Sequence, residues 1–287
     1  MCDGRLGPAA PSTERGPSSI GRAFTLMGDP VTLFAVRASP PHCLQRWTRV
    51  PLTDAAVLER RLSPDRLAPY RQDVGGDLRK AFELYEWNAR MGATFWRTLG
   101  HVEVLVRNAM HDQLTTWSLQ QHGESRWYLD PGGIFTDKTT ESIEAAVQKL
   151  RAKRRDETTG RVVAELSWGF WRFLLISSYD RSLWLPCLRH AWPAHSLRQT
   201  LYDPMDRLND LRNRIAHHEP IYNRPLRDLH TTALTLAEWT CPATAEWIRA
   251  QCEVLDMLKT RPWTRPCQTG QPTRRSGGGS GRRQRRR

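Results

Sequence analysis

The chain has 287 residues, of which 39% are hydrophobic and 25% are charged, so it is long enough to bury a core without disulfides. Its formal net charge of +13 favours polyanionic partners such as nucleic acid. Seven of the arginines lie in residues 274–287, where no acidic residue is present, so the middle of the chain is only mildly basic.

The two ends of the chain differ in composition from its middle. Residues 1–50 are rich in Pro, Gly and Ser and predict a disordered N-terminal extension, and the Gly/Arg-rich residues 263–287 predict a disordered basic tail. Residues 51–262 predict one all-α domain, a helical bundle, because helical periodicity recurs and no run of alternating β-branched residues competes. The predicted helices cover 53–62, 64–70, 77–90, 93–117, 139–155, 161–178, 180–190, 194–201, 203–218, 225–239 and 242–259.

Several classes of protein are disfavoured by what the sequence lacks. The most apolar stretch, residues 162–177, is short and contains Glu165 and Arg172, so it predicts a buried helix and no membrane partner. The six Cys form no CxxC pair and are typical of reduced thiols in a cytoplasmic protein. No nucleotide-binding glycine motif and no carboxylate cluster with metal-ligand spacing is found, so we expect neither a cofactor nor a metal.

The segment DPMDRLNDLRNRIAHHEPIYNRP, residues 203–225, holds the most informative polar cluster. Asp203 and Pro204 are typical of the start of a helix, with Pro204 expected at its first position. The helix must end near residues 218–219, because the residue before Pro220 is pushed out of the α region. Arg212, Asn213, His217 and His218 therefore gather over the last turns of this helix.

This cluster contains the two residue types that metal-independent RNA cleavage requires. His217 has an ordinary pKa near ~6.5 and can transfer protons at neutral pH, while Arg212 can stabilise charge on phosphoryl oxygens. A spacing of five residues separates the two side chains by about 140° on an ideal helix. Both reach one phosphate only if the helix end is distorted or if two copies of the helix meet.

A purely structural interpretation of the same residues is also open. A His-His-Glu sequence at a helix C-terminus is a common cap that the helix dipole favours. Arg212 would then be an ion-pair partner of Asp210 or Glu219.

A second polar group lies in HVEVLVRNAMHDQL, residues 101–114. Glu103, Arg107 and His111 are spaced by four residues and share one helix face, and Asn108 follows Arg107. This face is either a surface ladder of ion pairs or the lining of the groove that contains the Arg212 cluster.

Three stretches of the chain resemble the Abi-like (abortive infection) proteins of the HEPN superfamily. LRNRIAHHEPIYNRPL resembles the signature of that family, LYEWN and the residues around VLVRNAM are similar to its N-terminal half, and VVAELSWGFWRFLL resembles its central element. The resemblance covers roughly residues 60–260.

The resemblance implies a HEPN-like helical bundle that forms a homodimer, and a metal-independent endoribonuclease that binds RNA in phage defence or as the toxin of a toxin–antitoxin pair. It implies that Arg212 and His217 are catalytic. Supporting positions are Asn213, His218, Glu219, Glu103, Arg107, Asn108 and His111. An antitoxin protein would be a further partner. Some members of the superfamily are non-catalytic RNA-binding or protein-interaction modules, and this alternative stays open.

Overall fold

A computed structural model describes residues 52–262, with side chains from Asp54 onward, and in this range it contains helices and no strand. The prediction of an all-α fold is confirmed. The predictions for residues 1–50 and 263–287 lie outside the described residues. No helix in the described range is long and apolar enough to cross a bilayer.

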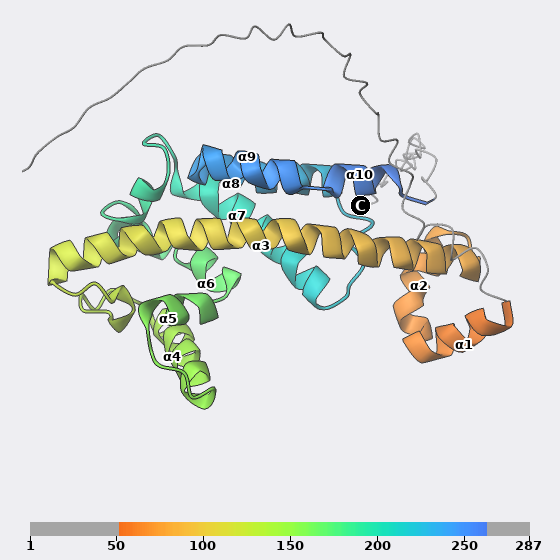
Figure 1. Ribbon diagram of the computed structural model, residues 1–287, viewed down its shortest axis with the longest axis horizontal. Coiled ribbons are helices and arrows are strands. Elements are labelled where there is room, and N and C mark those ends of the chain that lie inside the picture. Colours follow the sequence, from red (N-terminus) through yellow and green to blue (C-terminus); the bar gives the residue numbers. More distant parts are fainter. Residues whose placement is uncertain (1–51, 263–287) are drawn as a thin grey trace, which may run out of the picture. The chain divides into compact units, whose positions relative to one another are not determined.

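The helices are arranged around one long element, α3, drawn in yellow in Figure 1. Several helices pack against α3, among them α2, α7, α8, α9 and α10. Helix α4 packs against α5 and α6, and Figure 1 draws these helices below the C-terminal half of α3. The helices are α1 (Leu52–Leu62), α2 (Pro64–Asp73), α3 (Leu78–His122), α4 (Asp137–Ala152), α5 (Thr159–Glu165), α6 (Trp168–Phe173), α7 (Arg198–Ala216), α8 (Leu226–Thr240), α9 (Pro242–Gln251) and α10 (Val254–Lys259).

Helix α3 runs without interruption where the sequence predicted two helices, 77–90 and 93–117. Asp77 caps its N-terminus by accepting a hydrogen bond from the Lys80 N–H at 3.1 Å, and Gly123 ends it with a φ of 69°. Gly92 lies inside the helix, where Ile215 of α7 comes so close that an added Cβ would be 3.6 Å from Ile215 Cγ2. This separation is an ordinary van der Waals distance, so the packing of α7 leaves room for a Cβ at this position.

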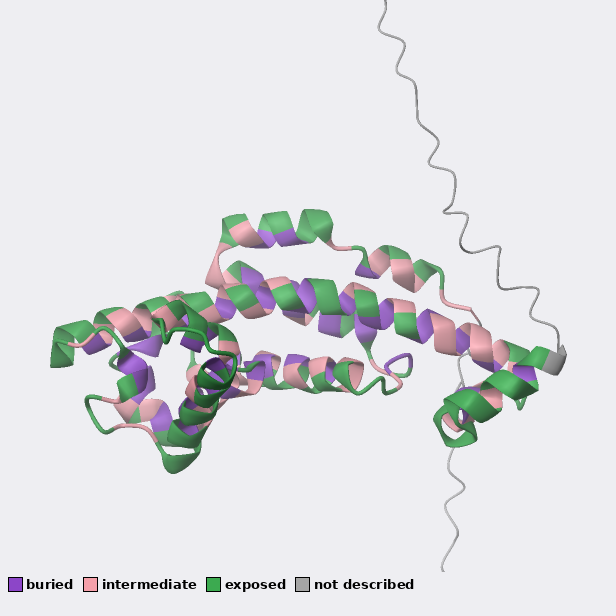
Figure 2. Ribbon diagram, turned by 60° about the horizontal axis from the view of Figure 1, so that its bottom comes forward, coloured by how far each residue is buried: buried purple, intermediate pink, exposed green. Residues whose placement is uncertain are grey.

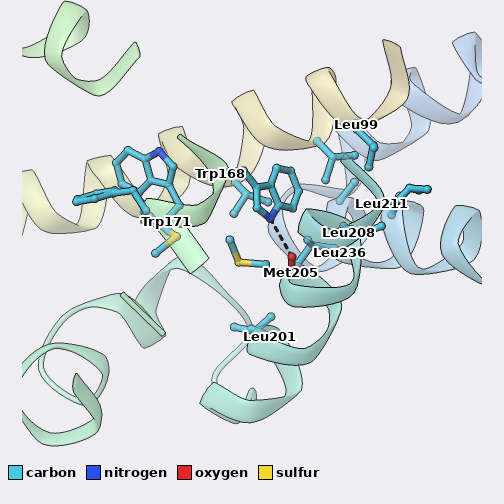
Figure 3. Packing of buried hydrophobic residues seen from close by; sticks show 14 of the residues in the cluster. Leu99, Trp168, Trp171, Leu201, Met205, Leu208, Leu211 and Leu236 are labelled. Carbon is cyan, nitrogen blue, oxygen red and sulfur yellow. Dashed lines mark hydrogen bonds between the residues drawn. The ribbon is translucent and has the colours of Figure 1, made fainter. Parts of the chain in front are cut away.

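The core lies between α3 and the helices that pack on it, and its residues form the buried stripes in Figure 2. Trp168 of α6 is 2% exposed, and its Nε1–H donates to the carbonyl oxygen of Met205 in α7 at 2.9 Å. Figure 3 shows this indole near Leu99 of α3 and Leu208 of α7. Trp168 therefore belongs to the core, as expected for the buried helix predicted over residues 162–177.

Helix α7 also joins two helices that the sequence predicted separately, 194–201 and 203–218. Pro204 lies inside α7, although it was expected at the first position of a new helix. An interior proline costs about 3 kcal/mol in an isolated helix. The buried residues Leu201, Met205 and Leu208 keep helical spacing across Pro204, so packing against the core holds the two parts in one helix.

Three other predicted helices were too long. The helix predicted over 161–178 is interrupted at Ser167, whose side chain caps α6 by accepting a hydrogen bond from the Phe170 N–H. The helix predicted over 242–259 is interrupted at Cys252, between α9 and α10. Residues 180–191 form short π and 3₁₀ turns where a helix over 180–190 was expected. Pro242 is at the first helical position, as predicted, whereas Pro225 lies one residue earlier, at the N-cap.

We expect Gly92→Ala to stabilise the fold by about 0.5–1 kcal/mol, because alanine restricts the unfolded chain and its Cβ makes an ordinary contact with Ile215. Gly92→Val adds two methyl groups at this approach and is expected to destabilise. Urea unfolding of both variants checks the prediction. Equal stability of the two variants would contradict the close approach of α7.

Candidate functional site

The end of α7 places the two motif histidines on its exit turn. His217 is the C-cap residue, with a φ of −91°, and His218 adopts a left-handed φ of 55°. Three successive N–H groups close the turn by donating to backbone carbonyl oxygens. The His217 N–H donates to the Asn213 carbonyl at 2.9 Å, and the His218 N–H donates to the Ile215 carbonyl at 3.0 Å. The Glu219 N–H donates to the Arg214 carbonyl at 2.8 Å. The helix thus ends close to the position that Pro220 had predicted. The imidazoles of His217 and His218 are both exposed.

The segment after this turn is held by a buried amide of α3. The Asn88 Oδ1 accepts hydrogen bonds from the N–H groups of Ile221 at 2.8 Å and Tyr222 at 3.0 Å. The Tyr222 hydroxyl donates to the Pro69 carbonyl at 3.1 Å. Two stretches that carry the family resemblance, LYEWN (84–88) and IY (221–222), therefore meet in space, although 133 residues separate Asn88 from Ile221.

An open cleft of about 610 Å³ lies between α3 and the end of α7. Its α3 wall includes Tyr85, Ala89 and Trp96, and its other wall includes Ile215, His218 and Glu219. The small side chains of α3 leave this space open, and the two aromatic rings give it flat apolar surfaces. The cleft is large enough for part of a ligand, and His218 lines it whereas His217 does not.

Arg212 is not held by the carboxylates that the structural interpretation assigned to it. Asp210 pairs with Arg214 at 3.3 Å and with Arg224 at 3.1 Å, and Glu219 pairs with Arg214 at 3.0 Å. The Arg212 guanidinium instead lies over the ring of Trp96, with its central carbon 5.1 Å from the ring centroid.

The Nε of Arg212 is buried without a hydrogen-bond partner among the described residues. Trp96 itself is 46% exposed, so the pair of Arg212 and Trp96 faces the solvent at the edge of the cleft. A guanidinium in this setting retains donors for an incoming phosphate.

Glu103 of α3 lies close enough to Arg212 of α7, and to Arg107 on its own helix, to interact with both electrostatically. Burial raises the pKa of Glu103, and the positive charges of Arg212 and Arg107 oppose that rise. No ion pair within 4.0 Å joins Glu103 to either arginine in the described chain, and the Arg107 Nε is also buried without a partner there. Glu103 and Arg107 therefore do not form the surface ladder of ion pairs, and Glu103 lies on the side of α3 that faces Arg212.

His111 lies on the same face of α3 as Glu103 and Arg107, and its side chain binds a core residue. Its Nδ1 accepts a hydrogen bond from the Trp127 indole N–H at 2.9 Å, and Trp127 is a core residue. Burial lowers the pKa of His111, and the neighbouring Asp112 charge opposes that effect. The structure thus gives His111 a packing contact beside Trp127, two turns of α3 beyond Glu103.

We expect His111 to make the fold less stable below pH 6.5. Its folded-state pKa is lowered, so the unfolded chain binds the proton more readily and stability is lost as pH falls through this range. Protonation at Nδ1 would also break the bond from Trp127. The drop in melting temperature from pH 7.5 to 5.0 should be smaller in His111→Gln than in the wild type. The exposed control His190→Gln should match the wild type, and an unchanged drop in His111→Gln would contradict the prediction.

The structure brings some of the expected site residues together and leaves others apart. Arg212 lies near Glu103, and His218 and Glu219 line the cleft, whereas Asn213 and Asn108 are exposed. Within the described chain, no hydrogen bond joins Arg212 to His217. Asn88 and Tyr85 were not predicted as site residues, although both stand in the LYEWN stretch, and no local pattern links Trp96 to Arg212.

Comparisons of the chain with family models, with curated proteins and with solved structures gave no match. Among the described residues, no group of three or more His, Cys, Asp or Glu side chains is arranged to hold a metal ion.

Proposed function

We propose that this chain is a metal-independent endoribonuclease of the HEPN type, similar to the Abi-like proteins, and that Arg212 and His217 carry the reaction. The proposal depends on the contacts of the Arg212 guanidinium, which lies over an aromatic ring and forms no ion pair among the described residues. It lies over the exposed Trp96 ring at the edge of an open cleft, while the neighbouring carboxylates Asp210 and Glu219 are paired with other arginines. The carboxylate that interacts electrostatically with Arg212 is Glu103, and no ion pair within 4.0 Å joins the two in the described chain.

The proposed reaction needs one proton carrier and one stabiliser of phosphoryl charge. His217 takes the proton of a ribose 2′-hydroxyl, and the resulting oxygen attacks the adjacent phosphorus. The bond to the 5′-oxygen breaks, that oxygen takes up the proton that His217 removed, and the products are a 2′,3′-cyclic phosphate and a 5′-hydroxyl end. Arg212 donates hydrogen bonds to the phosphoryl oxygens as their charge rises.

A second copy of the chain would complete this site. Arg212 packs on Trp96, whereas His217 is exposed on the exit turn, and their directions on an ideal helix differ by about 140°. An exposed stripe of small and apolar residues runs along α3 beside them, formed by Ala89, Ala93, Trp96, Gly100 and Val104. Ala89, Ala93 and Trp96 of this stripe also form the α3 wall of the cleft, so pairing along the stripe would bring a second copy of the chain over the cleft and beside the Arg212–Trp96 pair.

We expect Val104→Glu to weaken the homodimer, because a desolvated charge would lie in the stripe. Val104 is 42% exposed. Val57 of α1 is 45% exposed and lies away from the stripe, so Val57→Glu is a matched control. Analytical ultracentrifugation of the three proteins checks the prediction. A wild type that is monomeric at all concentrations, or equal weakening by both variants, would contradict the dimer.

The cellular role rests on the family resemblance. We propose that the chain cleaves RNA in the cytoplasm and thereby stops growth of the host cell. It would act either in phage defence or as the toxin of a pair with an antitoxin protein. Expression of the chain should then arrest growth, and His217→Ala should relieve the arrest.

The direct test is incubation of total RNA with the purified chain in EDTA, followed by mapping of the ends. New ends that carry 2′,3′-cyclic phosphate and 5′-hydroxyl groups are expected. A wild-type chain that binds RNA but leaves it intact would overturn the catalytic proposal and would indicate the non-catalytic RNA-binding module. Loss of cleavage in EDTA with recovery on adding Mg²⁺ would overturn the metal-independent mechanism.

A further inference from the structure

A second cationic feature lies at the start of α8, where three arginines surround a small cavity. The cavity has a volume of about 310 Å³, and its polar lining consists of Arg224, Arg227, Arg261 and Asp228. Three guanidinium groups face one carboxylate, so the lining carries a net positive charge. This cavity is lined by different residues from the cleft between α3 and the end of α7.

Two of the three arginines are not neutralised by carboxylates. Arg224 is paired with Asp210 at 3.1 Å, whereas no ion pair involves Arg227 or Arg261 within residues 54–262. The Nε of Arg261 is also buried without a hydrogen-bond partner in that range. Arg261 as a whole is only partly buried, and a ligand in the cavity would use the terminal nitrogens of its guanidinium.

Aromatic rings hold Arg261 in place on one side of the cavity. Its guanidinium carbon lies 5.6 Å from the Trp87 ring centroid and 6.0 Å from that of Tyr222. The Trp87 indole donates to the Met257 carbonyl at 3.2 Å, which ties the ring to α10. The guanidinium is therefore positioned in advance and needs little ordering when a ligand binds.

The backbone at the start of α8 adds to this arrangement. The first N–H groups of a helix have no carbonyl partner within it, and Pro225 at the N-cap has no side chain that can accept from them. The Leu226 N–H already donates to the Arg224 carbonyl at 2.8 Å, and the Leu229 N–H donates to the Pro225 carbonyl at 3.0 Å. The contribution of this helix start to anion binding therefore comes from the N–H groups of Arg227 and Asp228 and from the helix dipole.

We propose that this cavity binds a phosphate group, held by Arg227 and Arg261 against the first turn of α8. The proposal goes beyond the ribonuclease activity and does not depend on it. The phosphate can belong to an RNA backbone or to a small molecule such as a mononucleotide, and the test below distinguishes the two sources.

The primary measurement is calorimetric titration of the full-length His217→Ala chain with inorganic phosphate at constant ionic strength. We expect saturable binding that Arg227→Gln weakens at least tenfold. Arg261→Lys, which keeps the charge but loses the planar guanidinium over Trp87, should also weaken it. Arg181→Gln is the matched control, because Arg181 is exposed on another turn and has no ion pair in the described chain.

Competition then identifies the source of the phosphate. Displacement by a single-stranded RNA oligonucleotide, with Arg227-dependent affinity, would assign the cavity to an RNA backbone. Displacement by AMP but not by the oligonucleotide would assign it to a mononucleotide. Absence of saturable phosphate binding, or equal weakening by Arg181→Gln and Arg227→Gln, would overturn the proposal. RNA cleavage can persist in that case, so this failure is distinct from failure of the ribonuclease proposal.

Discussion

His217→Ala is expected to lower the rate of RNA cleavage by about 10²- to 10⁴-fold, the usual contribution of a general acid or base. Its imidazole is exposed at the C-cap of α7, and its N–H bond to the Asn213 carbonyl does not involve the side chain. The free energy of unfolding should therefore stay within about 0.5 kcal/mol of the wild type. Initial rates on a defined RNA, measured in EDTA, and urea unfolding provide the two readouts.

The controls separate loss of chemistry from loss of binding. His195→Ala removes another exposed imidazole and should cleave at the wild-type rate. RNA affinity of His217→Ala should remain near that of the wild type. Arg212→Lys should cleave more slowly than the wild type, because lysine keeps the charge but loses the planar donor fork. Wild-type rates in both His217→Ala and Arg212→Lys would rule out the proposed site.

Asn88→Ala is expected to destabilise the fold by about 2–5 kcal/mol, because the N–H groups of Ile221 and Tyr222 would both lose their acceptor in a buried place. Cleavage should also fall, since these residues follow the exit turn that carries His217 and His218. Denaturant unfolding and cleavage rates under native conditions measure the two effects.

Asn108→Ala makes the same substitution on the same helix at an exposed position. It should change the free energy of unfolding by no more than about 0.5 kcal/mol. If Asn88→Ala were as stable as Asn108→Ala, the Asn88 amide would not hold the 221–222 segment.

Local chemistry in the sequence determined the helical class and several helix ends. Pro64 and Pro242 each begin a helix, and Pro220 ends α7 within two residues of the predicted position. These signals depend on the conformation of one or two residues, so they can be read without knowledge of the partners. The sequence also placed Arg212 and His217 together at the end of one helix.

Long-range packing decided what local signals could not. Helix boundaries were predicted between residues 90 and 93 and at Pro204, yet Gly92 and Pro204 each lie inside a helix because buried residues on both sides pack against the same core. Propensity differences of about 1–3 kcal/mol are smaller than the gain from burying several large side chains, so packing prevails.

The roles of the polar residues were decided in the same way. The spacing of Asp210, Arg212, Arg214 and Glu219 is compatible with several ion pairs, and only the fold shows that Arg214 and Arg224 occupy the carboxylates while Arg212 lies over Trp96. His111 shares a helix face with Glu103 in sequence, but Trp127 engages it in space. Sequence therefore determined which chemical groups are present at the end of α7, and tertiary contacts decided which of them remain available to a ligand.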